Sequence, residues 1–562
     1  MSGSRAGVKT AGGGFVTRAA LLRMTSARAA AALFVLCLAG GACFAQAQTG
    51  AAARAKEDPA AWRAALDAVS PEEMKKHLSY IASDELQGRK TPSKGLDLAA
   101  EYIAAQFRRA GLEPAGDDGY FQTANWQLSS RDMAAVRLSF SGAPAPAPAV
   151  RAEQFGVGFA VAGFYFWEPE AELNLTGARV LKVVYGRAEQ LTPEQVGGRV
   201  VVTEFPAFPR GRQDEAFRLL REENEFMKRM RALGAPLVVA FDRTTERSRG
   251  ALGPRLFDPE GRSPRSSPLG TEPTAPLLFV RGAEAARFYD SLPDGATEAK
   301  LDVRIPAPVA APVKVRNVAG VLRGSDAALR DTYVIVSAHY DHIGVRENCD
   351  PGRADCINNG ANDDGSGTVA VVELAAALSK LNPRPRRSVL FLTFFGEEAG
   401  GLGSRYYGRH PLVPLRKTVA QVNVEQIGRT DDSEGPQVGS LAVTGFDYSE
   451  VGAVLQGAGE AEGVRVYKHP TKSDAYFSRS DNQSLADVGV PAHTVSVAFQ
   501  FPDYHDVGDE WQKIDYANMA RVARAVGRAL LRLADSAQEP RWNEQNPRAA
   551  SYVEAWRKLH GK

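Results

Sequence analysis

Hydrophobic and polar positions repeat with two different periods along this chain, and the change of period divides it into regions. Residues 58–114 place apolar side chains three or four positions apart, as on one face of a helix, and Gly111 with Pro114 supplies a stop signal. The stretch from about 115 to 300 has short apolar runs separated by Pro and Gly, which is typical of strands. From about residue 312 strand-like and helix-like segments alternate, which predicts an α/β sheet.

The α/β region contains short apolar runs that we predict to be buried strands. These runs cover residues 333–338, 388–395, 419–424 and 492–497. Residues 367–381 and 516–534 repeat apolar side chains at the helical period, so we predict helices there. The tail beyond Glu539 is polar and gives no clear prediction.

The middle of the chain has a strand–helix–strand pattern of its own. Residues 198–202 and 235–240 are predicted strands, and the amphipathic residues 214–233 between them are a predicted helix. We interpret the Met and Phe side chains of that helix as core. Residues 243–275 are rich in Arg, Ser and Pro, which predicts a loop.

The first 47 residues differ from the rest in charge and hydrophobicity. They hold five basic residues and no acidic one, and an apolar run over residues 29–44 ends in Ala45-Gln46-Ala47. These features are typical of a secretory signal peptide, so we expect cleavage after Ala47. The interpretation is a bacterial protein that is periplasmic or secreted and keeps no stable membrane insertion. An N-terminal membrane anchor is the alternative that this pattern leaves open.

Composition and charge exclude several classes of protein. Hydrophobic residues make up 44% of the chain and charged residues 24%, which is ordinary for globular proteins and excludes a disordered chain or a coiled coil. Lys and Arg number 68 against 66 Asp and Glu, so the net charge is only +2. Nucleic acid is therefore not an expected partner, because phosphate binding needs a clustered excess of basic groups. The oligomeric state is left open.

Two cysteines remain in the chain once the predicted signal peptide is removed. Cys349 and Cys356 flank an Asp-Pro-Gly turn, and no second pair of Cys or His stands at zinc-ligand spacing from them. An oxidising compartment permits a disulfide across such a short loop. We therefore predict that Cys349 and Cys356 form a disulfide.

Ionisable side chains follow each of the predicted strands. In chain order they are His339, Asp341 and His342, then Asp363 and Asp364, then Glu397 and Glu398, then Glu425, and last Tyr504 and His505. Because functional sites of open α/β sheets gather at the carboxyl ends of strands, we expect these side chains to meet. Several bare carboxylates in one cleft would repel each other, and a divalent cation would relieve that repulsion.

The mixture of imidazole and carboxylate groups favours zinc. Two zinc ions that share one carboxylate and one water would need five protein ligands, and an adjacent Glu pair can supply one ligand and one general base. We expect Asp341 to orient the His339 ring, and we interpret Asp364 as a charge at a helix N-terminus. His342 is interpreted as a rim residue or an orienting residue because five ligands are already available, although a ligand role stays open.

These segments, taken together and in order, resemble the dizinc aminopeptidase family that includes secreted bacterial leucyl aminopeptidases and, more distantly, glutamate carboxypeptidase and the transferrin receptor. The matching motifs are His-x-Asp, Asn-Asp-x-Gly-Ser-Gly, Glu-Glu, Asn-x-acid and Tyr-His, and the resemblance covers about 60–130 and 310–535. It implies an α/β fold in which a mixed β-sheet is sandwiched between helices.

The resemblance also implies a role for each site residue. His339, Asp363 and Glu425 would hold one zinc ion, and Asp363, Glu398 and His505 would hold the other. Glu397 corresponds to the general base, and Tyr504 corresponds to a tyrosine that supports the oxyanion. The chain departs from the family at Glu425, where the best-known members have Asp, and at Asn482, where many relatives have His.

Residues from about 155 to 300 resemble the β-rich protease-associated domain that many family members carry as an insertion. The predicted organisation is therefore a signal peptide (1–47), an N-terminal part of the peptidase domain (48–154), the insertion (155–305), the metallopeptidase core (306–540) and a tail (541–562).

The resemblance implies an exported aminopeptidase that hydrolyses N-terminal peptide bonds with a water activated by two zinc ions and with Glu397 as general base. The alternative is a dizinc carboxypeptidase or dipeptidase, which needs a cation for the terminal carboxylate of its substrate. Arg405, Arg429 and Arg479 are candidates for that cation. A non-catalytic scaffold ranks last, because such relatives lose ligands and all five are present here.

Overall fold

The computed structural model describes residues 60–142, 155–157, 159–161, 164–166, 171–206, 213–243, 255–257, 274–346, 349, 351–352 and 354–562. The predicted signal peptide lies outside these residues. Among the described residues, no helix has the length and apolar character needed to cross a membrane.

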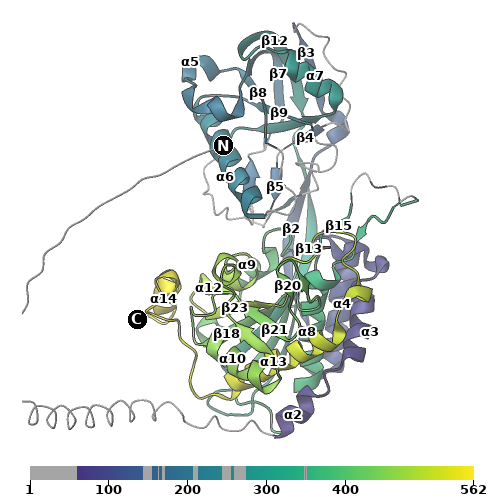
Figure 1. The fold of residues 1–562 in the computed structure, drawn as a ribbon, viewed down its shortest axis with the longest axis vertical. Helices are drawn as coiled ribbons and strands as arrows, with labels where there is room; N and C mark the ends of the chain where they lie inside the picture. The colour runs from purple at the N-terminus through teal and green to yellow at the C-terminus, as the bar shows by residue number, and fades with distance from the viewer. Residues whose placement is uncertain are drawn as a thin grey trace, which may run out of the picture. The chain divides into compact units, whose positions relative to one another are not determined.

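The larger sheet has the strand order β10-β2-β13-β17-β14-β18-β23-β21-β22, with β1 paired to β13. Figure 1 labels β2, β13, β18, β21 and β23 of this sheet. Its strands are β1 (Glu113–Pro114), β2 (Phe121–Ser130), β10 (Arg255–Phe257), β13 (Val309–Leu322), β14 (Tyr333–His339), β17 (Ser388–Phe394), β18 (Thr418–Val424), β21 (Ser440–Val443), β22 (Arg465–Tyr467) and β23 (Ala492–Ser496). Strands β17, β14, β18 and β23 are mutually parallel, whereas β13 and β21 join them antiparallel. The sheet is therefore mixed, as predicted.

Helices cover both faces of this sheet. One core contains side chains of α2 (Ala60–Leu66), α3 (Pro71–Ile81), α4 (Lys94–Arg109), α8 (Ser366–Leu378), α10 (Val451–Ala461) and α13 (Tyr516–Asp535). The other core contains side chains of α9 (Leu402–Arg409), α12 (Asn482–Ala486) and α14 (Ala550–Leu559). Within β14, Val334 and Val336 face the first core and Ile335 faces the second, so the strand is buried on both sides.

The middle of the chain forms a second sheet of order β3-β12-β7-β8-β9-β11-β4. Its elements are β3 (Arg137–Ser141), β4 (Phe155–Val157), β7 (Leu173–Lys182), β8 (Val200–Glu204), α6 (Gln213–Ala232), β9 (Val238–Asp242), β11 (Leu277–Arg281), α7 (Ala283–Ser291) and β12 (Gly295–Ile305). This sheet contributes to two hydrophobic cores. One of them contains side chains of α7, and the other contains side chains of α6. The predicted strand–helix–strand pattern is confirmed by β8, α6 and β9.

Short elements complete the described structure. They are the hairpins β5 (Phe159–Val161) with β6 (Phe164–Phe166), β15 (Gly344–Val345) with β16 (Ile357–Asn358) and β19 (Asp431–Asp432) with β20 (Gly435–Pro436), and the helices α5 (Pro193–Val196) and α11 (Lys472–Ala475). The remaining short helical segments are η1 (Asp84–Arg89), η2 (Met133–Ala135), η4 (Tyr185–Gln190), η5 (Ala361–Gly365), η6 (Leu415–Lys417), η7 (Trp511–Lys513) and η8 (Pro547–Ala549). Cys349 and Cys356, beyond β15, form the predicted disulfide.

One prediction needs correction, and one segment without a clear prediction forms a helix. The predicted loop over residues 243–275 contains β10, which pairs antiparallel with β2 and buries Leu256 in the first core. The tail beyond Glu539 contains the helix α14, whose Val553 is buried in the second core. The strand β10 is only three residues long, so its own sequence carries little periodic signal.

Candidate active site

The parallel strands bring the candidate residues to one edge of the sheet. His339 is the last residue of β14, Glu425 follows β18 directly, and Glu397 and Glu398 follow β17 after a short turn. Asp363 lies in η5, at the entry to α8. The four parallel strands end at this edge because parallel neighbours in register place their carboxyl ends side by side.

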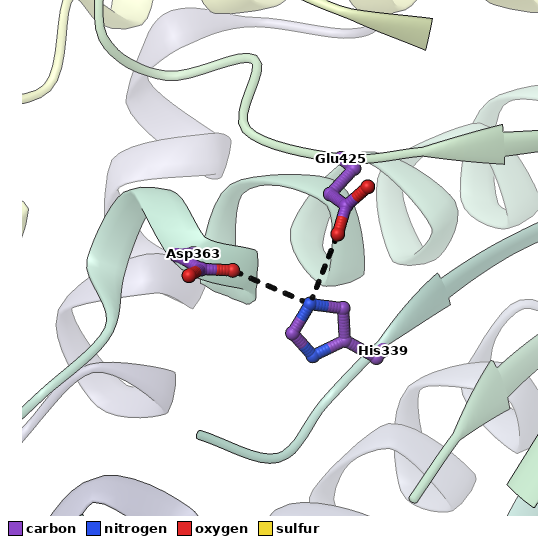
Figure 2. A group of neighbouring side chains, drawn as sticks. All are labelled: His339, Asp363 and Glu425. Atoms are coloured by element: carbon purple, nitrogen blue, oxygen red, sulfur yellow. Dashed lines mark ion pairs between the residues drawn. The ribbon is translucent and has the colours of Figure 1, made fainter. Parts of the chain in front are cut away.

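The first cluster joins His339, Asp363 and Glu425. His339 Nε2 lies 3.4 Å from an Asp363 oxygen and 3.5 Å from a Glu425 oxygen, and Figure 2 shows both carboxylates directed at the same ring nitrogen. His339 is fully buried and Asp363 nearly so. The three ligand atoms lie within 4.8 Å of one another, which is compatible with one shared cation.

The second cluster uses the other oxygen of Asp363. His505 Nε2 lies 3.1 Å from Asp363 Oδ2 and 3.1 Å from Glu398 Oε2. His342 also belongs here, because its Nδ1 is 2.7 Å from Glu398 Oε1. Asp363 therefore turns Oδ1 to His339 and Oδ2 to His505, so one carboxylate lies between the two clusters.

The buried polar atoms of both clusters fit a divalent cation. Among the described residues, His339 Nε2, Asp363 Oδ2, Glu398 Oε1 and both ring nitrogens of His342 are buried without a hydrogen-bond partner. Unpaired buried polar atoms cost about 1–3 kcal/mol each, and a cation in each cluster would supply the missing partner. Imidazole and carboxylate together are a zinc-type donor set.

Charges in the two clusters shift each other's pKa values. Burial by itself would raise the pKa of Asp363, but His339 and His505 outweigh it and hold that pKa well below its usual value. For Glu397, burial raises the pKa well above its usual value; His339 opposes the shift and Glu425 adds to it. A carboxyl group with a raised pKa is suited to accept a proton and return it.

Asp341 connects the His339 ring to the segment that carries Glu397. Its Oδ1 accepts a hydrogen bond of 3.0 Å from the Glu397 backbone N–H and lies 3.5 Å from His339 Nδ1. The prediction for Asp341 concerned only the ring of His339, and the contact to Glu397 was not predicted.

Asp364 has a larger structural role than a charge at a helix N-terminus. Its Oδ1 accepts hydrogen bonds from the backbone N–H groups of Gly367 and Gln426, at 3.0 and 3.1 Å. Its Oδ2 accepts one of 3.3 Å from the N–H of His339. Asp364 therefore fastens the start of α8 to the ends of β14 and β18, where the first cluster is formed.

The segment that carries Tyr504 and His505 is anchored on both sides. Asp503 accepts hydrogen bonds of 2.8 Å from Arg429 and 3.0 Å from Lys513. The Tyr504 ring stacks on the His505 ring with centroids 4.0 Å apart. Burial raises the pKa of the Tyr504 hydroxyl well above its usual value, and nearby carboxylates add to the shift, so this hydroxyl stays protonated and can donate.

The candidate carboxylate-binding arginines differ in their surroundings. Arg429 donates to Asp431 and Asp503, so two carboxylates of the protein already engage it. Arg479 places its guanidinium 4.3 Å from the centre of the Tyr476 ring. Arg405 is half-buried, and burial lowers its pKa while the charges of Asp487, Asp481 and Glu397 act in the opposite direction.

Asp481 is a further carboxyl group near the first cluster. It is fully buried, and neither of its oxygens has a hydrogen-bond partner among the described residues. Burial raises its pKa to about 7, with His339 opposing and Glu425 adding to the shift. Asp481 and Glu397 are thus two carboxyl groups that lie beside the clusters and are not among the predicted metal ligands.

Arg89 is a supporting residue that the sequence interpretation missed. Its side chain is fully buried and donates hydrogen bonds to the backbone carbonyls of Tyr340, Asn359 and Gly360, at 2.8, 2.7 and 2.9 Å, and to Ile81. It thereby fastens the segments that carry His339 and Asp363. The residue lies in a turn between two helices, where a basic side chain is ordinarily exposed, so local sequence gave no signal.

Replacing Arg89 by Met should lower the free energy of unfolding by about 3–5 kcal/mol, because the variant leaves several buried carbonyls without donors. Denaturant unfolding of the metal-loaded protein measures this change. Arg63→Met, at an exposed position on α2, is the matched control and should change little. A loss below 1 kcal/mol for Arg89→Met would contradict the supporting role.

The fold and these clusters define an α/β domain with two candidate metal sites at one edge of its sheet. Residues 317–530 match peptidase family M28, and this stretch contains every residue of the two clusters. The match covers 317–530 of the 562 residues and agrees with the resemblance drawn from the sequence motifs.

Curated relatives match parts of the chain. A probable zinc metalloprotease of Pyricularia oryzae is 25% identical over 321 residues, covering 48% of this chain and 61% of the relative. The aminopeptidase NAALADL1 of Mus musculus is 23% identical over 48% of this chain and 40% of its own. The probable glutamate carboxypeptidase LAMP1 of Arabidopsis thaliana is 26% identical over 40% of this chain and 32% of its own. The chain thus spans between 32% and 61% of the length of these three relatives.

Solved structures share the fold. The aminopeptidase from Aneurinibacillus sp. strain AM-1 superposes with a TM-score of 0.54 at 18% identity, covering 85% of this chain and 96% of that one. BSAP, a zinc aminopeptidase from Bacillus subtilis, gives a TM-score of 0.53 at 16% identity, covering 84% and 97%. At these identities the likeness supports the fold.

Proposed function

We propose that this protein is a dizinc aminopeptidase that removes residues from the free amino terminus of peptides. The observation that carries the proposal is the position of Asp363, whose two oxygens face two separate clusters of imidazole and carboxylate groups. His339 and Glu425 would complete the first metal site, and Glu398 with His505 would contribute to the second. Zinc bound at these sites would supply Lewis-acid activation of a water molecule and of the scissile carbonyl.

Glu397 and Tyr504 would perform the proton transfers and the charge stabilisation. Glu397 would accept the proton of the attacking water and return it to the leaving amine. The protonated Tyr504 hydroxyl would donate a hydrogen bond to the oxyanion of the transition state.

The balance of charge around the clusters favours an amino-terminal substrate. Burial raises the pKa values of Glu397 and Asp481, and a substrate ammonium group beside them would stabilise their ionised forms. Arg429, one of the cations that a carboxypeptidase would require, is bound to Asp431 and Asp503. The aminopeptidase therefore ranks above the carboxypeptidase.

Matched peptides distinguish the two activities. One set has a free amino terminus and the other is N-acetylated, and each is incubated with the zinc-loaded protein, with a chelator, and after zinc is restored. We expect cleavage of the free-amine set alone, loss of it with chelator, and its return with zinc. Equal cleavage of acetylated peptides from the carboxyl end would overturn the aminopeptidase assignment and direct attention to Arg405.

Tyr504→Phe should lower kcat by about 100-fold and change KM little, because the hydroxyl acts on charge that develops in the transition state. Steady-state kinetics with one free-amine peptide measures both constants. A variant with unchanged kcat would remove Tyr504 from the mechanism.

We further propose that residues 1–47 direct export and that the inserted sheet is a protease-associated domain. The basic and apolar pattern of the N-terminus supports the first proposal. The Cys349–Cys356 disulfide also supports it, because such bonds persist in oxidising compartments. The β8–α6–β9 unit supports the second proposal.

A further inference from the structure

His342 lies inside the second cluster and not at its rim. The residue follows β14 by three positions and is only 1% exposed. Its Nδ1 is 2.7 Å from Glu398 Oε1, and its ring centroid is 5.6 Å from that of His505. Ligand atoms of His342, Asp363 and Glu398 lie within 4.8 Å of one another. The imidazole is therefore as close to a shared cation position as the predicted ligands are.

The ring of His342 lacks the hydrogen bonds that a purely structural histidine makes. Both of its nitrogens are buried without a partner among the described residues, and so is Glu398 Oε1, the oxygen that faces Nδ1. By contrast, the buried His493 pairs one nitrogen with Ser449 and the other with the Thr444 carbonyl. Two acceptor atoms at 2.7 Å repel each other unless a cation or a proton lies between them.

The backbone around His342 prevents the ring from turning away. Gly360 has a φ of +59°, and a Cβ atom at that position would lie 2.4 Å from Cγ of His342. The backbone N–H of His342 donates a hydrogen bond of 3.4 Å to the carbonyl of Arg89, the buried residue that also fastens Gly360. A ring packed against a glycine in this way is preorganised to present Nδ1 to Glu398.

We propose that His342 is a third imidazole ligand of the metal centre and binds the second cation through Nδ1. This inference rests on the proposed function, since it assigns a ligand at the metal sites named there. The second site then has His342, His505, Glu398 and Asp363 as protein ligands, whereas the first has His339, Glu425 and Asp363. The two sites are therefore unequal, and the second cation should bind more tightly than the first.

Cobalt substitution counts the coordinated imidazoles directly. In proton NMR spectra of a protein loaded with Co²⁺, the ring N–H of each bound histidine gives a strongly shifted resonance in H₂O that disappears in D₂O. We expect the spectrum of wild-type protein to lose one such resonance in His342→Gln, while the resonances of the other bound histidines remain. The same variant should bind its tighter cation about 100-fold more weakly, as measured by competition with a chelator.

The control is His560→Gln, which changes a histidine near the C-terminus of the chain and should keep every shifted resonance. If His342→Gln binds two Co²⁺ ions and also keeps every resonance, His342 only orients Glu398 and the proposal is wrong. If wild-type protein binds no Co²⁺ and no Zn²⁺, the proposed function fails as well, so the two failures are distinguishable.

Discussion

Replacing Glu397 by Gln should lower kcat by about 100- to 10,000-fold while both zinc ions stay bound. The amide has nearly the shape of the carboxylate but cannot accept the proton of the attacking water. The backbone N–H of Glu397 would still donate to Asp341, so the segment should keep its position. Initial rates with a free-amine peptide, together with elemental analysis of the same sample, measure both quantities.

Glu554→Gln is the matched control, because Glu554 is an exposed residue of α14. Its activity and zinc content should equal those of the wild-type protein. Loss of one zinc ion in Glu397→Gln would place Glu397 among the ligands and leave the general base unassigned.

Replacing Asp363 by Asn should weaken both metal sites at once and lower activity by about 1,000-fold or more. The reason is geometric, because the two oxygens of this carboxylate face different clusters and an amide offers only one oxygen. Zinc content after dialysis against a weak chelator measures the effect.

Glu425→Gln is the comparison for this prediction. Glu425 contacts His339 in the first cluster, so that variant should lose one zinc ion and keep the other. If Asp363→Asn and Glu425→Gln lose the same single ion, Asp363 does not bridge the two sites.

The sheet of this domain could be predicted closely from the sequence, because its central strands are continuous apolar runs. The run predicted at 388–395 became β17 (Ser388–Phe394), and the run at 492–497 became β23 (Ala492–Ser496). Such strands are buried on both faces, so an apolar local composition is enough to predict them as strands. The weak signals of β10 and α14 reflect contacts made with distant parts of the chain.

The strand ends indicated which residues form the site, and the family resemblance grouped five of them into two ligand sets. The structure brings His339, Asp363 and Glu425 together, and Asp363 with Glu398 and His505. It also brings His342 into the second cluster, which the sequence interpretation placed at the rim or among the orienting residues.

Arg89 shows the limit of sequence interpretation most clearly. Its role depends on backbone carbonyls that lie about 250 to 270 positions away in the sequence, at Tyr340 and Gly360. Backbone carbonyls are present at every position, so the residue types in the sequence do not predict which carbonyls a buried guanidinium group will bind.

Zinc titration of the metal-free protein tests the central claim most directly. The protein is stripped with a chelator, zinc is returned in fractions of one equivalent, and hydrolysis of a free-amine peptide is followed at each step. We expect activity to depend on zinc and to reach its maximum at two equivalents per chain. Full activity without added metal, or a maximum at one equivalent, would contradict a centre in which Asp363 joins two zinc sites.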